Sequence, residues 1–116
     1  IFAAGLSSPL AEAICKDAGT GISAAGTVQG DATALTAAVN FVGTVASGSG
    51  VILPASASAG DFVFVYNGGA NTLKIYPTSG AKINALGTNV ATSLPVNTGS
   101  AFFCGSSTAW GMVQSA

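Results

Sequence analysis

The residues that could perform acid–base chemistry are four carboxylates, Glu12, Asp17, Asp31 and Asp61, and the chain contains no histidine. Glu12 and Asp17 do not share one face of a helix. Their spacing of five residues corresponds to about 500° of turn, which leaves the two side chains about 140° apart around the helix axis. Asp31 and Asp61 each follow a glycine, a position where an aspartate usually bonds its own turn backbone. The sequence therefore offers few side chains suited to general acid–base catalysis, and we expect the protein not to be an enzyme.

The two cysteines, Cys15 and Cys104, allow two interpretations. They are either buried thiols that pack as small apolar side chains, or a disulfide that ties the N-terminal segment to a late strand. In the chain-entropy model, closing so long a loop would stabilise the fold by about 4 kcal/mol. Two cysteines without histidine cannot complete a zinc site or form a Cys–His nucleophile pair. We therefore expect no metal and no cofactor.

Charge is unusually scarce, since only 6% of the residues are charged, compared with about 25% in ordinary soluble domains. The mean hydropathy is +0.61. A near-neutral surface of this kind promotes association, so we expect part of it to be buried against other chains. Three lysines are too few for the phosphate contacts of nucleic-acid binding. The sequence contains no run of about 18 apolar residues, the length that a membrane-spanning helix needs.

The elements that would position these residues begin with a predicted helix from Ser7 to Gly19. Ser8 suits the N-cap, Pro9 the first turn and Gly19 the left-handed stop. So short a helix is not stable alone in water and must pack on a neighbour. The Gly/Ala/Thr-rich stretch from Gly19 to Gly30 is expected to be irregular or extended.

Residues 1–30 are therefore interpreted as an N-terminal helix and extended arm. Two hypotheses remain open for this part of the chain. The helix either docks on its own domain, or it is an arm that reaches the lattice of a larger assembly or a neighbouring subunit. Its expected contact residues are the apolar side chains Leu6, Leu10 and Ile14.

Residues 31–116 predict a single β domain. Short apolar runs recur there every 8–12 residues or so, with glycine-rich turn signals between them. This pattern favours a mainly β fold, a β-sandwich or barrel of about seven or eight short antiparallel strands.

The clearest pattern is the stretch from Phe62 to Ile83, which predicts a β-hairpin. Phe62, Phe64 and Tyr66 alternate with valines, so both faces of the first strand are apolar and we expect both to be covered. The expected core anchors are Phe62, Phe64, Phe102 and Trp110.

Several segments between residues 32 and 113 combine turn glycines with apolar positions. They are TVASGSGVILP (44–54), AGD (59–61), NGGANTLKIYP (67–77), SGAKINAL (79–86), SLPVNTGSAF (93–102) and Trp110. Together these segments resemble small β-rich structural proteins of tailed bacteriophages, and the resemblance covers roughly residues 32–113.

This resemblance implies a virion component without catalytic activity. The first expectation is a capsid decoration, or cement, protein on the outer surface of the capsid that bridges capsid subunits. Its partners would be the major capsid protein and copies of itself, commonly as a homotrimer. Besides the N-terminal apolar residues, Tyr66 and Tyr76 are expected at such contacts.

The alternative is a head or tail fibre or spike component, or a module that binds a host glycan weakly. Exposed aromatic rings can stack on sugars, and Tyr66, Tyr76 and Trp110 are the candidates for such stacking.

Overall fold

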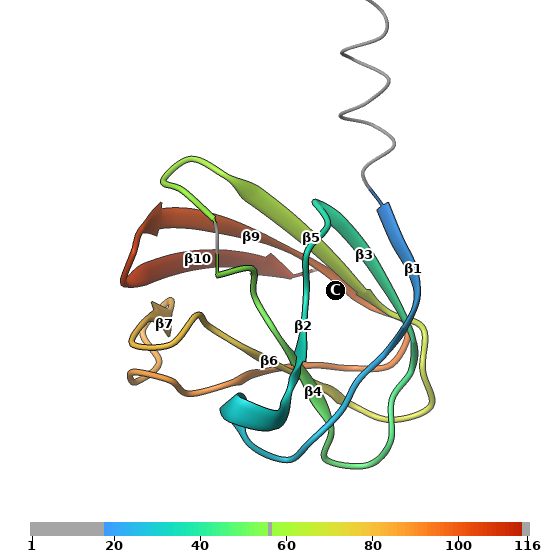
Figure 1. The fold of residues 1–116 in the computed structure, drawn as a ribbon. Coiled ribbons are helices and arrows are strands. Elements are labelled where there is room, and N and C mark those ends of the chain that lie inside the picture. Colours follow the sequence, from blue (N-terminus) through green and yellow to red (C-terminus); the bar gives the residue numbers. More distant parts are fainter. Residues whose placement is uncertain (1–17, 56, 115–116) are drawn as a thin grey trace, which may run out of the picture.

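The computed structural model describes residues 18–55 and 57–114. This part of the chain is mainly β and forms two sheets (Figure 1). The predicted helix lies outside the described residues, except that its last two positions belong to the first strand. The strands are β1 (Ala18–Ser23), β2 (Thr33–Ala34), β3 (Val39–Thr44), β4 (Gly50–Ile52), β5 (Phe62–Asn67), β6 (Leu73–Tyr76), β7 (Lys82–Ile83), β8 (Thr92–Leu94), β9 (Gly99–Ser106) and β10 (Ala109–Gln114), with a 3₁₀ turn η1 (Gln29–Asp31).

The first half of the described chain winds like a solenoid. Strands β1, β3 and β5 lie side by side and parallel in one sheet, and strands β2, β4 and β6 do the same in the other. The chain therefore alternates between the sheets, and each coil adds one strand to both (Figure 1).

The second half closes this winding by reversing direction. Strand β8 pairs antiparallel with β6, β9 pairs antiparallel with β5, and β10 pairs antiparallel with β9. Strand β7 joins the far edge of the larger sheet parallel to β10. The result is a six-stranded sheet of order β1-β3-β5-β9-β10-β7 and a four-stranded sheet of order β2-β4-β6-β8.

The prediction of mainly β structure is confirmed, but the prediction of an antiparallel sandwich or barrel is wrong. Five of the eight strand pairings among the described residues are parallel, and the arrangement is solenoid-like. The predicted hairpin is also wrong, because β5 and β6 belong to different sheets. Alternating polarity identifies a strand and its buried face, but it does not identify the strand's partner.

The connection from Asn67 to Asn71 turns the chain from one sheet to the other. The buried Asn67 side chain donates to the carbonyls of Asn71 and Leu94, each at 2.9 Å, and accepts from the Gly69 N–H at 2.9 Å. Asn71 donates to the Val45 carbonyl at 2.8 Å. Backbone N–H and C=O groups at a corner have no neighbouring strand to pair with, and these side-chain bonds give them hydrogen-bond partners.

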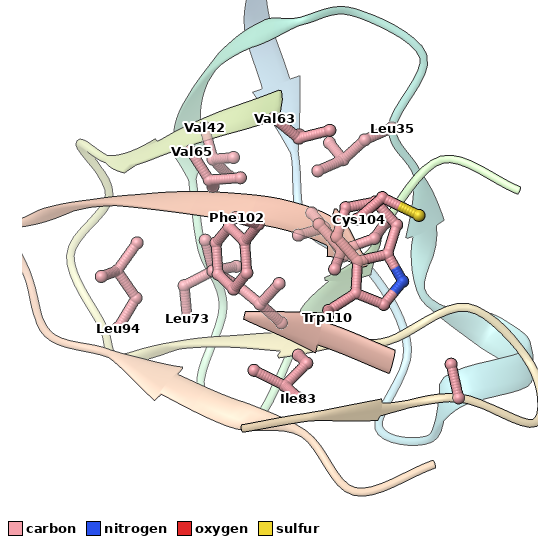
Figure 2. Close-up of a cluster of buried hydrophobic side chains, with 14 of the residues drawn as sticks. Leu35, Val42, Val63, Val65, Leu73, Ile83, Leu94, Phe102, Cys104 and Trp110 are labelled. Carbon is pink, nitrogen blue, oxygen red and sulfur yellow. The ribbon is translucent and has the colours of Figure 1, made fainter. Parts of the chain in front are cut away.

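The core lies between the two sheets (Figure 2). Phe102 of β9 points towards Leu73 and Leu94 of the smaller sheet, and all three side chains are fully buried. Trp110 is also buried, and its indole N–H lies 3.3 Å from the Thr78 hydroxyl oxygen. Phe102 and Trp110, two of the expected core anchors, thus lie in this core.

The other two expected anchors, Phe62 and Phe64, are not core residues. Their side chains are 55% and 41% exposed. The valines between them, Val63 and Val65, occupy the core instead. The reason is the pleat: only one face of β5 can point towards the smaller sheet, and the β-branched residues take it.

The stretch from Gly19 to Gly30, expected to be irregular or extended, includes most of strand β1. Strand β1 pairs with β3 from Ala18 onwards, with register shifts around Gly21 and Ile22. Residue 18, the first described residue, therefore already belongs to the six-stranded sheet.

Candidate functional site

The most unusual surface of the molecule is the outer face of the six-stranded sheet. Strands β3, β5, β9 and β10 place large apolar side chains there, opposite to the core. We call this set the aromatic face: Val39, Phe41, Phe62, Phe64, Tyr66, Ala101, Phe103 and Val113.

The strand register brings the rings of this face into contact. Phe41 lies beside Tyr66 with ring centroids 5.9 Å apart, because the two residues are paired across β3 and β5. Phe62 meets Phe103 edge-on at 5.0 Å, because they are paired across β5 and β9. Phe62 also stacks with Phe64 at 6.4 Å. These contacts lie within the range of favourable aromatic pairs, so the rings hold one another in place.

A hollow of about 590 Å³ lies next to the ridge formed by β5. Small residues form its floor, where the Tyr66 ring leans over Gly99 and Ala101 follows in the same strand. Val39 and Phe41 border it on β3, and Val113 borders it on β10. Large rings beside small residues give this face a ridge and a groove, a shape that can receive the side chains of another segment.

No charged side chain is among those that line the hollow. Among the described residues, Asp61 precedes β5 and accepts the Ser58 N–H at 2.8 Å, the turn role that the sequence predicts. Lys74 belongs to the other sheet, and Asp31 lies in η1. Lys82 is exposed and belongs to β7, at the far edge of the larger sheet beyond β10, and it does not line the hollow. Association through this face would therefore rest on apolar contact rather than on ion pairs.

The exposed apolar surface of this face is comparable to the largest apolar patch on a typical monomer. Phe41, Phe62, Phe64 and Tyr66 are each between 37% and 55% exposed. Because an aromatic side chain carries about 200 Å² of surface, these four rings leave roughly 350 Å² in water. Apolar patches of this size on a folded monomer are often functional.

The other candidate residues that the structure describes do not gather into a reactive site. Within the described residues, no group of three His, Cys, Asp or Glu side chains could hold a metal ion, and no helix there is long and apolar enough to cross a membrane. Cys104 is buried, with its sulfur 3.3 Å from the Ser106 carbonyl oxygen. Cys15 lies outside the described residues, so the predicted disulfide stays a prediction.

The residues expected at contacts fall in three places. Tyr66 lies on the aromatic face. Tyr76 is buried, which contradicts its expected contact role, and its hydroxyl donates to the Thr27 carbonyl at 3.2 Å. The apolar residues Leu6, Leu10 and Ile14 lie outside the described residues.

Phe41, Phe103 and Val113 belong to the aromatic face but were not expected there from the sequence. For Phe41 and Phe103, the alternation of residues along the strand could have predicted this position. Phe41 stands between the buried Asn40 and Val42, and Phe103 stands between the buried Phe102 and Cys104. A period-two reading of these strands places both rings on the outer face.

Comparison of the chain with protein-family models, with curated proteins and with solved structures finds no match in any of the three.

Proposed function

We propose that this protein is a non-catalytic structural component of a tailed-phage particle, most specifically a decoration protein that stabilises the assembled capsid from outside. The observation that carries this proposal is the aromatic face, which exposes aromatic surface without charge on a domain whose own core is complete. Covering such a face with a partner is favourable, because removal of apolar surface from water contributes about 25 cal/mol per Å². The resemblance of the sequence to phage structural proteins supports the choice of a virion as the setting.

The protein would act by bridging neighbouring subunits of the shell. Each apolar contact contributes little by itself, but a decoration protein is present in many copies and bound at several points. Linked contacts raise the overall strength of attachment far beyond that of one contact. The scarcity of charge suits this role, since apolar attachment is not screened by salt.

A fibre or spike component is the second candidate, and the winding of the chain favours it. Within the described residues, β1 forms one edge of the six-stranded sheet and β2 forms one edge of the four-stranded sheet. In longer solenoids a further coil stacks on such an edge. A role in glycan binding receives less support, because the hollow is lined mainly by apolar side chains, whereas sugars require several polar partners.

The experiment that separates these functions is the copy number of the protein in purified particles, measured by quantitative mass spectrometry against the major capsid protein. A ratio near one to one supports shell decoration. A ratio of a few per cent supports a fibre. Absence from the particles overturns the virion proposal.

A further inference from the structure

One dipeptide in this chain, Asn67–Gly68, has a chemistry that the proposed function does not use. The chain contains six asparagines, and Asn67 is the one that a glycine follows. Asparagine is a thermolabile residue, and a following glycine makes its deamidation fast in a flexible chain. Glycine has no Cβ to shield its nitrogen, and its backbone adopts many conformations. The sequence at this point therefore carries a potential modification site.

Deamidation begins with attack of the glycine backbone nitrogen on the side-chain carbon Cγ of the asparagine. The new N–Cγ bond closes a cyclic imide. The Cγ–Nδ2 bond breaks, and Nδ2 leaves as ammonia with the proton of the glycine N–H. Water then opens the imide and gives aspartate or isoaspartate. The reaction requires a free glycine N–H, an asparagine side chain that can rotate towards it, and access of water.

The fold withholds the attacking nitrogen. Asn67 ends β5, at the corner where the chain crosses to β6 in the other sheet (Figure 1). The Gly68 N–H donates to the Val42 carbonyl of β3 at 2.9 Å. Attack requires removal of this proton, and a backbone hydrogen bond inside a sheet protects it from base.

The fold also holds the group that would be attacked. Nδ2 of Asn67 donates to the Asn71 and Leu94 carbonyls, each at 2.9 Å, and Oδ1 accepts the Gly69 N–H at 2.9 Å. Rotation of the side chain towards Gly68 would break these bonds. Asn67 is fully buried, so water does not reach the imide carbon. Deamidation of Asn67 therefore requires the corner to open.

The product would not fit the corner that the asparagine occupies. A carboxylate only accepts hydrogen bonds, so it would leave the Asn71 and Leu94 carbonyls without a donor. Burial of an unpaired charge is also strongly unfavourable. Isoaspartate in addition lengthens the main chain, next to Gly69, where an added Cβ would already lie 2.6 Å from Cγ2 of Val45. A chain that has reacted should therefore not return to this fold.

We propose that Asn67–Gly68 is a deamidation site that is closed in the folded protein and reacts when the chain unfolds, and that this modification makes unfolding irreversible. Chemical modification of the unfolded state is a general route to irreversible loss of a protein. Folded copies keep Asn67, whereas copies that unfold leave the folded pool. The inference goes beyond the proposed function, since it concerns the lifetime of the chain in any setting.

A second Asn–Gly pair in the same loop provides the matched control. Thr72→Gly places a glycine after Asn71, whose exposed side chain donates to the Val45 carbonyl. The unsubstituted full chain and this variant are incubated in ¹⁸O-labelled water at mildly alkaline pH, in buffer and in concentrated urea. Chymotryptic digestion in unlabelled water at mildly acidic pH, followed by mass spectrometry, gives the initial rate of ¹⁸O entry at Asn67 in the first protein and at Asn71 in the second. Trp110 fluorescence checks that the samples in buffer are folded.

In urea, we expect the two sites to react at comparable rates, since each precedes a glycine in an unfolded chain. In buffer, Asn67 should react at least about 100-fold more slowly than in urea, because fewer than about one chain in a thousand of a stable domain is unfolded. Asn71 should slow by less than about tenfold, because exposed loops open at little cost. After removal of urea, gel filtration should recover folded protein with intact Asn67 and leave the modified chains in the unfolded fraction.

Three results would overturn the inference. A rate at Asn67 in buffer within about tenfold of its rate in urea would show that the corner opens without unfolding. Equal slowing of Asn71 and Asn67 in buffer would show that the buried bonds of Asn67 are not the protection. Modified chains that refold and unfold at the same urea concentration as intact chains would show that the reaction is harmless. These rates are measured on purified protein and do not depend on the copy number in particles, which tests the proposed function.

Discussion

The side-chain amide of Asn67 donates to the backbone carbonyl of Leu94 across 2.9 Å. This bond joins the end of β5 in the larger sheet to β8 in the smaller sheet, two strands that pair with different partners. It ties the corner after the last wound strand of the larger sheet to β8, the first strand that runs in the reverse direction.

Replacement of Asn67 by alanine should destabilise the fold by about 3 kcal/mol, because each buried group left without a partner costs about 1–3 kcal/mol. The substitution removes the hydrogen-bond partner of the Asn71 and Leu94 carbonyls and of the Gly69 N–H. Urea unfolding followed by Trp110 fluorescence measures the change. As a comparison, Asn71→Ala should cost about 1 kcal/mol, since it removes one bond at an exposed side chain. Equal effects would contradict a central role for Asn67.

The two glycines that follow Asn67 differ in the space around them. A Cβ at Gly69 would lie 2.6 Å from Cγ2 of Val45 and 2.8 Å from its backbone nitrogen, whereas the nearest atoms to a Cβ at Gly68 are 3.6 Å away. Gly69→Ala should therefore cost about 2 kcal/mol, as overpacked positions do, and Gly68→Ala should cost less than about 0.5 kcal/mol. Thermal unfolding of both variants measures this difference. Similar melting temperatures would show that the corner can move away from Val45.

The two faces of the larger sheet should respond differently to the loss of an aromatic ring. Phe102 is fully buried and Phe62 is 55% exposed. Phe102→Ala should destabilise the domain by about 4 kcal/mol through the lost burial and the cavity left behind. Phe62→Ala should cost about 1 kcal/mol, mainly through its ring contacts with Phe64 and Phe103. Chemical unfolding of the purified variants gives both values, and a comparable loss in the two would place Phe62 in the core after all.

Local features of this fold could be read from the sequence, but its pairing could not. Alternation within 62–66 identifies a strand, and the apolar stretch 101–104 identifies another. The partner of a strand depends on contacts far along the chain. The corner after Asn67 has the same glycines and asparagines as a hairpin turn. It differs from a hairpin in the pairing of the strands on either side, because β5 pairs with β3 and β9 whereas β6 pairs with β4 and β8.

The candidate site could be predicted only in part from the sequence. Two apolar faces on β5 predicted that both would be covered, and one of them is covered by the domain's own core. The other, with Phe62, Phe64 and Tyr66, is exposed in the single chain. The sequence indicates that a face is apolar, but it does not show whether the cover comes from the same chain or from a partner.

Attachment through the aromatic face should be insensitive to salt and sensitive to polar substitution. The side chains that line the hollow carry no charge. Sodium chloride at 1 M shortens the Debye length to about 3 Å and so weakens ion pairs between exposed charges. This salt concentration should therefore not release the protein from particles. Phe64→Gln should lower its occupancy on particles at least tenfold, while the melting temperature changes by no more than a few degrees because Phe64 contributes little to the core. Sedimentation of particles with quantification of the bound protein measures occupancy, and Ser93→Gln on the opposite sheet serves as the control. Release by salt alone would show that ion pairs hold the protein in place. Unchanged occupancy of the Phe64 variant would move the contact to another surface.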